Sequence, residues 1–313
     1  MRVYEFARNN EMTSKEVVAI CHELGIDVKA QSKLDEIQLA TLNSHLLGGK
    51  DSIEKVEMTP KVVKKSKESK SIAYAVTECE PFTSLGELGK TAANFANKAI
   101  KEGRSIIITL PKYKEVTEMY GTSMEWLMDL PIKVGTKEVR ASLFKLVQDS
   151  ITYLFIGNDD YFTREQIYGY EDDVERFAFF NRAVIEALPH LGTKIKELYV
   201  NDWHTSMIPL ILNIDYQNHV FYKKVKTTLM IHNLEYQGWY NVDILPEVIG
   251  ISREYYDNGL TRMGDCVNLL KSGIETSNRI QLNESCTYQL QLPQMQESGI
   301  VTVIEGKLNS KAS

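Results

Sequence analysis

The stretch YVNDWHTSMIPLIL, residues 199–212, indicates how the main part of the chain folds. With Leu198 before it, the stretch opens on an apolar run long enough for a buried strand. A polar cluster follows at 201–205, and apolar residues then recur at helical spacing. A strand that ends in a polar turn and opens a helix is half of a βαβ unit. In open parallel sheets, ligands bind just outside the carboxyl ends of the strands. Asp202 and His204 are therefore expected at such an end, near the positive N-terminus of the following helix.

The same side chains also have a purely structural interpretation. Asp202 or Thr205 would cap the helix, and His204 would bond to backbone. For an isolated DWHT sequence this interpretation is favoured, and the remaining stretches of the chain shift the balance toward a site.

Strands and helices alternate on both sides of this stretch. Strands are predicted at 72–76, 105–110 and 227–231, with helices at 92–100 and 172–188. This order is typical of α/β proteins with a parallel sheet. The loops after Val76, Val200 and Ile231 are then expected to open on one edge of that sheet. Two further runs, 140–147 and 151–156, flank a polar turn and predict a β-hairpin insertion.

Bulk properties exclude several classes of protein. The 313 residues are 43% hydrophobic and 25% charged, as in ordinary globular proteins, and allow one large domain plus a small one. The net charge of −6 argues against a nucleic-acid footprint over the whole chain. No apolar run reaches the roughly 18 residues of a membrane span, and the N-terminus lacks an apolar signal core, so we expect a cytoplasmic protein. The four cysteines are scattered, which favours free thiols over a zinc site or disulfides.

The first 48 residues are expected to form a small all-α module. Thr13 and Glu16 match a capping box at a helix start, and Ser32 and Asp35 offer a second start. Residues 49–71 are rich in lysine and contain no aromatic residue, which is typical of a linker. Residues 72–313 would then form the main domain. A sharper alternative is a contact of residues 1–71 with nucleic acid or the ribosome.

The sequence RVYEFARNNEMTSKEVVAICHELGIDVKA resembles the N-terminal module of bacterial translation initiation factor two. The shared pattern is R-V-Y-E-x-A, then M-[TS]-[SK]-K-E, then L-G-I-D-V, within about the first 47 residues. The resemblance implies a docking module rather than a catalytic one, because no phosphate-binding G-x-x-x-x-G-K-[ST] loop follows.

Residues from about 72 to about 308 resemble the N-terminal half of the bacterial glycogen and starch synthase family of glycosyltransferases. The matching motifs keep their order: E-x-x-P-F at Glu78–Phe82, LPKY at Leu110–Tyr113, the run from Tyr161 to Ala183, DWHT at Asp202–Thr205, and IHNLEYQG at Ile231–Gly238, with KSGIETSNRI after them. The resemblance implies a Rossmann-like domain that is the first half of a two-domain architecture with the active site between the domains. It also implies glucosyl transfer from a nucleotide-glucose to an α-1,4-glucan, with retention and without a metal or other cofactor.

The resemblance further implies candidate sugar contacts. His204 matches a histidine that faces the transferred glucose, and Asn233 matches the asparagine of I-H-N. Tyr161, Tyr168 and Asp173 match positions near the acceptor side of the cleft. Each also has a structural interpretation, as a ring that fills the core or as a helix cap.

The resemblance also implies a loop that holds the donor's phosphates, here residues 84–88, called the donor loop. This loop departs from the family pattern K-x-G-G-L. Ser84 stands in place of the lysine, Gly86 is kept, and Glu87 replaces the second glycine. A cation is lost and a carboxylate gained where phosphates would bind, which is worth about 4 kcal/mol per unit charge at 4 Å and an effective dielectric near 20. The family's cationic groups for the leaving diphosphate belong to the C-terminal domain, and the sequence after Leu308 does not match that domain.

These departures predict a protein that does not catalyse transfer alone and acts in sugar or glucan recognition or as a scaffold. Partners are expected to be an α-glucan or nucleotide-sugar, and a protein that covers the open cleft face. Two alternatives remain open. The chain is one half of a transferase completed by a separate polypeptide, or it is an adaptor linked to ribosomes or RNA.

Overall fold

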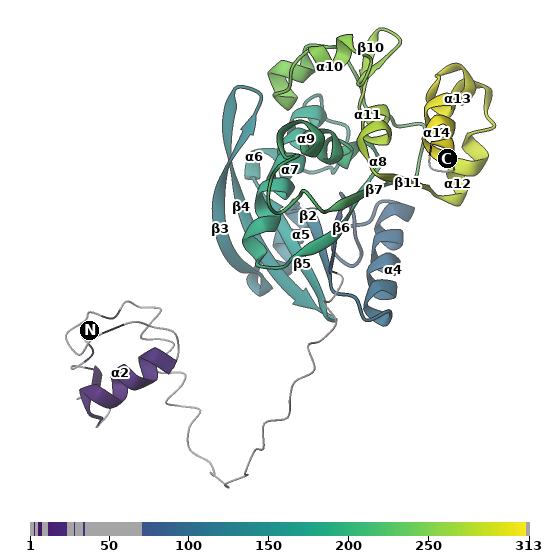
Figure 1. The fold of residues 1–313 in the computed structure, drawn as a ribbon. Helices are drawn as coiled ribbons and strands as arrows, with labels where there is room; N and C mark the ends of the chain where they lie inside the picture. Colours follow the sequence, from purple (N-terminus) through teal and green to yellow (C-terminus); the bar gives the residue numbers. More distant parts are fainter. Residues whose placement is uncertain are drawn as a thin grey trace. The chain divides into compact units, whose positions relative to one another are not determined.

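A computed structural model of the chain describes residues 3, 6, 7, 12–23, 28, 34 and 71–310. The chain divides into two compact units, Met1–Lys64 and Lys65–Ser313, and each is described here by itself (Figure 1). The finer division at residues 48 and 71 remains a prediction.

The first unit contains helix α2, Ser14–Glu23. Its predicted capping box is confirmed. The backbone N–H of Thr13 donates to the Glu16 carboxylate over 2.7 Å, and the N–H of Glu16 donates to the Thr13 hydroxyl over 3.3 Å. Beneath the helix lies a small apolar core of Val3, Phe6, Ala7, Val17, Cys21, Val28 and Leu34. The predicted second start at Ser32 and Asp35, and the linker up to residue 70, lie outside the described residues.

The strands of the second unit form one large sheet and one small one. The large sheet contains β1 (Ser71–Ala75), β2 (Ile106–Pro111), β3 (Glu125–Val134), β4 (Lys137–Gln148), β5 (Ile151–Gly157), β6 (Ile195–Asn201), β7 (Lys226–Ile231) and β11 (Arg279–Leu282). Their order is β11-β7-β6-β1-β2-β5-β4-β3. The small sheet has the order β8-β10-β9, with β8 at Trp239–Tyr240, β9 at Arg262–Met263 and β10 at Cys266–Asn268.

The helices of the second unit lie between its strands and, in the last part of the described chain, after β11. They are α4 (Glu87–Lys101), α5 (Lys114–Tyr120), α6 (Asp159–Phe162), α7 (Asp173–Ala187), α8 (Asp202–Thr205), α9 (Met207–Asp215), α10 (Glu254–Asp257), α11 (Leu269–Thr276), α12 (Glu284–Gln289), α13 (Pro293–Glu297) and α14 (Ile300–Asn309). Short helical turns lie at 121–123, 188–191 and 245–249. No helix of the described residues combines the length and apolar character needed to cross a membrane.

The predicted α/β class and the predicted strands are confirmed. Strands β1, β2, β5, β6, β7 and β11 run parallel where they pair, so their carboxyl ends share one edge of the sheet. Tyr74 of β1 and Tyr199 of β6 stack with ring centroids 6.1 Å apart, and Phe95 of α4 packs on both. Helix α7 packs on β3, β4 and β5 and carries a row of buried phenylalanines.

The predicted hairpin is confirmed as β4 and β5, which pair antiparallel from Ser142–Gly157 to Gln148–Ile151. Its turn holds Asp149 and Ser150 at positive φ, 51° and 65°. The sequence did not predict β3, which pairs with β4 and extends the sheet by one more strand (Figure 1). Pro131 lies inside β3, and a proline is tolerated there because β3 is the edge strand.

Candidate functional site

The three predicted loops do meet at the carboxyl edge of the sheet. They line a pocket of about 790 Å³, here called the edge pocket. Its walls are Glu78, Leu85, Gly86, Glu87, Leu88, Tyr168, Gly169, Asp173, Asp202, Trp203, His204, His232, Asn233, Tyr236, Ser285 and Gln289. Of the candidates from the sequence, the pocket brings together Gly86, Glu87, Tyr168, Asp173, His204 and Asn233. Ser84 and Tyr161 are not among its walls.

Asp202 connects two of the loops instead of capping its own helix. Its Oδ1 accepts hydrogen bonds from the backbone N–H of His232 over 2.7 Å and of Asn233 over 3.4 Å. The residue has a φ of 51°, which is uncommon outside glycine but tolerated best by Asp and Asn. Burial raises the pKa of Asp202, while the two N–H groups favour its charged form. The carboxylate thus holds the loop after β7 against the start of α8.

The His204 ring lies in an aromatic setting. Its centroid is 4.2 Å from Trp203, 4.8 Å from Tyr168 and 4.9 Å from Phe177. Its Nδ1 is buried and has no hydrogen-bond partner among the described residues. Burial and then the charge of Arg176 lower the pKa of His204 to about 3. At neutral pH the ring is therefore an uncharged donor and acceptor facing the edge pocket.

Glu78 organises the donor loop, a role that sequence reasoning missed. Its Oε2 accepts from the backbone N–H of Leu85 over 2.6 Å and of Gly86 over 3.4 Å, at the start of α4. Its Oε1 accepts from the Tyr168 hydroxyl over 2.8 Å. The signal was present, because Glu78 opens the E-x-x-P-F motif, but the motif does not reveal which groups the carboxylate meets.

The other two polar residues of the donor loop point elsewhere. The Ser84 hydroxyl donates to the carbonyl of Gly86 over 3.1 Å. The Glu87 side chain is 80% exposed and pairs with Lys90 at 3.0 Å. Glu87 therefore faces solvent, as its structural interpretation expected. The carboxylate that contacts the loop amides is that of Glu78.

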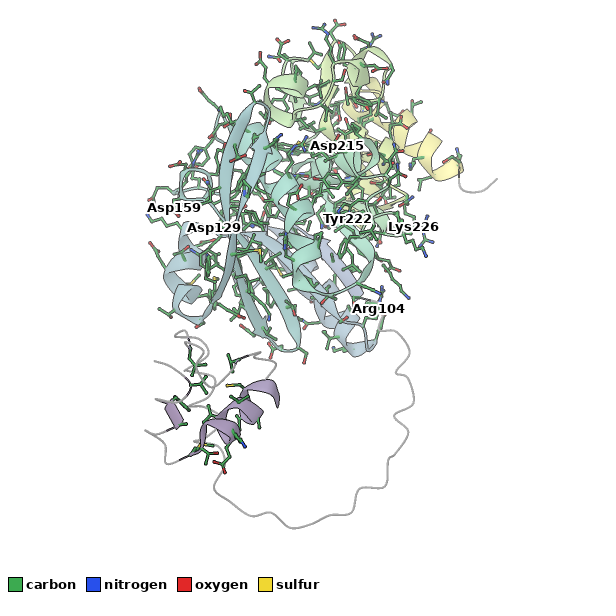
Figure 2. The ribbon with its side chains drawn as sticks, turned by 60° about the vertical axis from the view of Figure 1, so that its left-hand side comes forward. Arg104, Asp129, Asp159, Asp215, Tyr222 and Lys226 are labelled. Carbon is green, nitrogen blue, oxygen red and sulfur yellow. The ribbon has the colours of Figure 1, made fainter. Side chains whose placement is uncertain are left out.

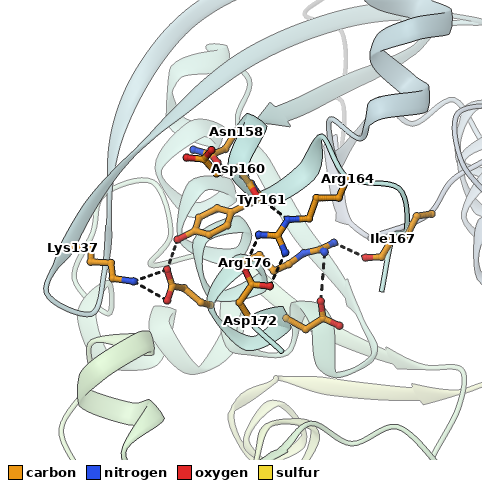
Figure 3. Close-up of polar contacts among 10 residues, drawn as sticks. Lys137, Asn158, Asp160, Tyr161, Arg164, Ile167, Asp172 and Arg176 are labelled. Atoms are coloured by element: carbon orange, nitrogen blue, oxygen red, sulfur yellow. Dashed lines mark hydrogen bonds and ion pairs between the residues drawn. The ribbon is translucent and has the colours of Figure 1, made fainter. Parts of the chain in front are cut away.

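Tyr161 and Asp173 occupy different surroundings although both were matched to the acceptor side. Figure 3 labels Tyr161 and Lys137 among the polar contacts of this region. The Tyr161 hydroxyl donates to Glu175 over 2.6 Å, and Glu175 also accepts from Lys137 over 2.9 Å. Asp173 reaches the edge pocket, where it accepts from the backbone N–H of Gly169 over 2.8 Å. It also pairs at 3.5 Å with the fully buried Arg176. Asp173 is thus held in place by contacts that do not use Tyr161.

Asn233 and its neighbour His232 complete the wall formed by the loop after β7. The Asn233 amide oxygen accepts from the Glu235 N–H over 2.9 Å and from the Gln289 side chain over 2.8 Å. His232 Nε2 lies 2.8 Å from Asn201 Oδ1, and its Nδ1 is buried without a partner among the described residues. His232 was part of the I-H-N motif, but the sequence analysis did not single it out.

The charge of the edge pocket is one-sided. Three of its wall residues, Glu78, Asp173 and Asp202, carry carboxyl groups, a fourth, Glu87, faces solvent and pairs with Lys90, and none of its walls is a lysine or arginine. Within the described part of the chain, no group of three or more histidine, cysteine or acidic residues could hold a metal ion. The pocket can therefore accept hydrogen bonds from hydroxyl groups and pack rings against a sugar, but it offers an anion no cationic partner.

Comparison with known proteins finds similarity to starch and glycogen synthases. A family profile for the starch synthase catalytic domain matches residues 71–304. Glycogen synthase of Lactobacillus acidophilus is 36% identical over 209 residues, which are 67% of this chain and 44% of that protein. Glycogen synthase of Desulforamulus reducens is 35% identical over 228 residues, 72% of this chain and 47% of that protein. The chain thus spans about half the length of the curated relatives it matches.

A solved structure shares the fold. The catalytic domain of starch synthase IV from Arabidopsis thaliana, bound to ADP and acarbose, superposes with a TM-score of 0.67 at 21% identity. The match covers 78% of this chain and 50% of that one. With the family profile covering most of the second unit, this chain belongs to the starch synthase catalytic domain family of glycosyltransferases.

Proposed function

We propose that the edge pocket binds the end of an α-glucan, and that this chain by itself does not transfer glucose. The observation that carries the proposal is the absence of lysine and arginine from the pocket walls. Family membership supports a sugar as the ligand, and the Arabidopsis starch synthase was solved with ADP and acarbose.

The charge of the pocket bears on catalysis because the leaving group is a nucleoside diphosphate. Preorganised positive charge at the developing anion is often the largest catalytic contribution in such transfers. The donor loop here offers its Leu85 and Gly86 amides to Glu78, so an internal carboxylate already occupies them. A phosphate at this place would meet negative charge and engaged amides.

An uncharged sugar fits the same walls better. Tyr168, Trp203 and Tyr236 offer aromatic faces, and Asp173 offers carboxylate oxygens to sugar hydroxyls. In this proposal His204 contacts the glucose unit through its neutral ring, and Asn233 shapes the opposite wall. Tyr161 acts only through Glu175, outside the pocket.

Calorimetry with the full chain tests the proposal. Maltoheptaose is expected to bind and ADP-glucose to bind much more weakly, with no release of ADP in the presence of both. The variant His204→Ala should lose glucan affinity, whereas Glu87→Gln, on an exposed side chain, should keep it. Measurable glucose transfer by the purified chain would overturn the non-catalytic part, and absence of glucan binding would overturn the rest.

A second candidate function is one half of a transferase that a separate polypeptide completes. Among the pocket walls, the side chains of Leu85 and Tyr236 are 69% and 65% exposed, and a covering protein would remove this apolar surface from water. Co-purification from cells tests this candidate. A second Rossmann-like subunit recovered in stoichiometric amount supports it, and a chain that elutes alone as a monomer contradicts it.

The resemblance of residues 1–47 to the initiation factor module supports a separate docking role for the first unit. The contact of residues 1–71 with nucleic acid or the ribosome remains a prediction as well. Removal of residues 1–47 should leave maltoheptaose binding unchanged and abolish any ribosome co-sedimentation. Sedimentation that persists without these residues would contradict the docking role.

A further inference from the structure

The amino ends of the strands carry a cluster of basic residues at the edge opposite the edge pocket. We call this cluster the basic edge: Arg104, Lys194, Lys223, Lys224, Lys226 and Arg279. Arg104 precedes β2, Lys194 precedes β6, Lys226 opens β7 and Arg279 opens β11. Figure 2 labels Arg104, which lies before β2, and Lys226, which opens β7. Because these strands run parallel, their first residues share one edge.

The strand register brings these side chains close together. Lys226 of β7 is the Cα partner of Glu197 in β6, and Arg279 of β11 is the partner of Thr228 two residues farther along β7. Arg104 forms an ion pair with Glu197. Burial acts to raise the pKa of Glu197, but the hydrogen bond and charge of Arg104 lower it, and the charge of Arg279 acts in the same direction. One carboxylate is therefore influenced by two cations, Arg104 before β2 and Arg279 at the start of β11, and Lys226 is its register partner in β7.

Most of the basic edge is available to a partner. Lys194, Lys223, Lys224, Lys226 and Arg279 are exposed, and none forms an ion pair with a described residue. Three carboxylates on the helices that precede β6, β7 and β11 are engaged. Asp215 pairs with Arg182 at 3.5 Å, Glu275 pairs with Lys271 at 3.5 Å, and Glu186 accepts from the Tyr216 hydroxyl. This concentration of positive charge stands out in a chain whose net charge is −6.

The spacing of the cations favours a polymer over a single phosphate. Neighbouring strands lie about 4.8 Å apart, so the cations that open the adjacent strands β7 and β11, Lys226 and Arg279, recur on the scale of successive charges in a polyanion. Aromatic rings lie beside them. The His219 ring is 5.5 Å from Tyr222, and Phe221 is 4.9 Å from Tyr222, directly before Lys223. His219 is exposed, and Val220 beside it is 79% exposed.

From this arrangement we propose that the basic edge binds single-stranded nucleic acid. The lysines and Arg279 contact the phosphates, and the ring of His219, backed by Tyr222, stacks on a base. Cations that follow a backbone together with rings that stack bases are the two features that single-strand binding sites share. An acidic protein surface would form ion pairs with the cations, but it has no bases that could stack on the ring of His219. This site is independent of the glucan site proposed above.

Fluorescence anisotropy of a labelled 20-mer of uridine, with the full chain, tests the proposal. The double variant Lys224→Gln, Lys226→Gln is compared with Lys133→Gln, Lys145→Gln, which removes two lysines from β3 and β4. The first should weaken binding about tenfold or more at 50 mM salt. It should also reduce the slope of log K against log salt by about 1.4, at about 0.7 per lost contact with a single strand. The second should leave both values unchanged.

Two further measurements separate the components of the site. His219→Ala should lower the affinity severalfold without changing the salt slope, since stacking releases no counterions. Poly-glutamate at equal charge should compete poorly with the oligonucleotide. Equal loss in both double variants, an unchanged affinity in His219→Ala, or full competition by poly-glutamate would each overturn the proposal.

Discussion

The hydroxyl of Tyr168 donates to the carboxylate of Glu78 over 2.8 Å, although the two residues are 90 positions apart in the chain. The same carboxylate accepts from the amides of Leu85 and Gly86, so it joins the donor loop to the segment before α7. Since both regions are walls of the edge pocket, this side chain fixes one part of the pocket, as Asp202 does for the loop after β7.

We expect Glu78→Gln to destabilise the second unit by about 1–3 kcal/mol, the usual cost of a weakened buried acceptor. The substitution keeps the size of the side chain but replaces one acceptor oxygen by an amino group. Urea unfolding followed by near-UV absorption measures the effect. Glu87→Gln serves as the control, because its exposed side chain pairs only with Lys90, and it should stay within about 0.5 kcal/mol of wild type.

The buried ring of His204 predicts a specific dependence of stability on pH. Its pKa is lowered from 6.5 to about 3, so the unfolded chain binds a proton below pH 6.5 that the folded chain rejects. The contribution of His204 to the free energy of unfolding is fully present above pH 6.5 and declines as the pH falls toward 3. At pH 5 it has fallen by about 2 kcal/mol. His204→Asn should remove this part of the difference between pH 7 and pH 5. An unaltered pH profile in the variant would show that the ring is protonated in the folded protein.

Arg176 is expected to be essential for stability. It is fully buried, pairs with Asp173 at 3.5 Å, and donates to the carbonyl of Ile167, and its guanidinium lies 5.0 Å from the Phe177 ring. Arg176→Ala would leave a buried carboxylate unpaired and open a cavity, at a cost of about 3–5 kcal/mol. The exposed Arg253, paired only at 3.9 Å with Asp257, gives the control. Thermal unfolding should show a large drop for the first variant and little change for Arg253→Ala.

Gly135 in the turn between β3 and β4 should not tolerate a methyl group. Its φ is 57°, and a Cβ there would lie 1.7 Å from the carbonyl oxygen of Glu247. Gly264 has nearly the same φ, 59°, and nothing within 4 Å of such a Cβ. Gly264→Ala therefore measures the backbone strain alone, about 1 kcal/mol. Gly135→Ala should lower the free energy of unfolding in urea clearly more than Gly264→Ala does. An equal decrease in the two variants would contradict the close contact.

The sequence predicted the fold well because hydrophobic periodicity is a local property. The alternation of strands and helices, the hairpin of β4 and β5, and the meeting of three loops all follow from runs of apolar residues and turn signals. Strand β3 was missed because residues 125–134 are half exposed at the sheet edge and mix polar with apolar side chains.

The site was predicted less completely, because its contacts join residues far apart in the chain. Nothing local to Glu78 indicates that its carboxylate reaches Tyr168. Likewise, nothing local to Asp202 indicates that it holds the amides of His232 and Asn233 rather than its own helix. Tyr161 was grouped with Asp173 from motif position alone, yet it bonds to Glu175. Side-chain direction within a motif depends on tertiary packing, which the motif does not encode.

The parallel direction of the strands separates the molecule's two charged regions by the length of a strand. The seven residues of β6 span roughly 23 Å at about 3.3 Å per residue. At physiological ionic strength the Debye length is about 8 Å, so charge neutralised at one end is screened before it is felt at the other. If both proposed ligands bind, the two ends can therefore be occupied at the same time and in either order, and a molecule held on a polyanionic support would keep its edge pocket turned outward.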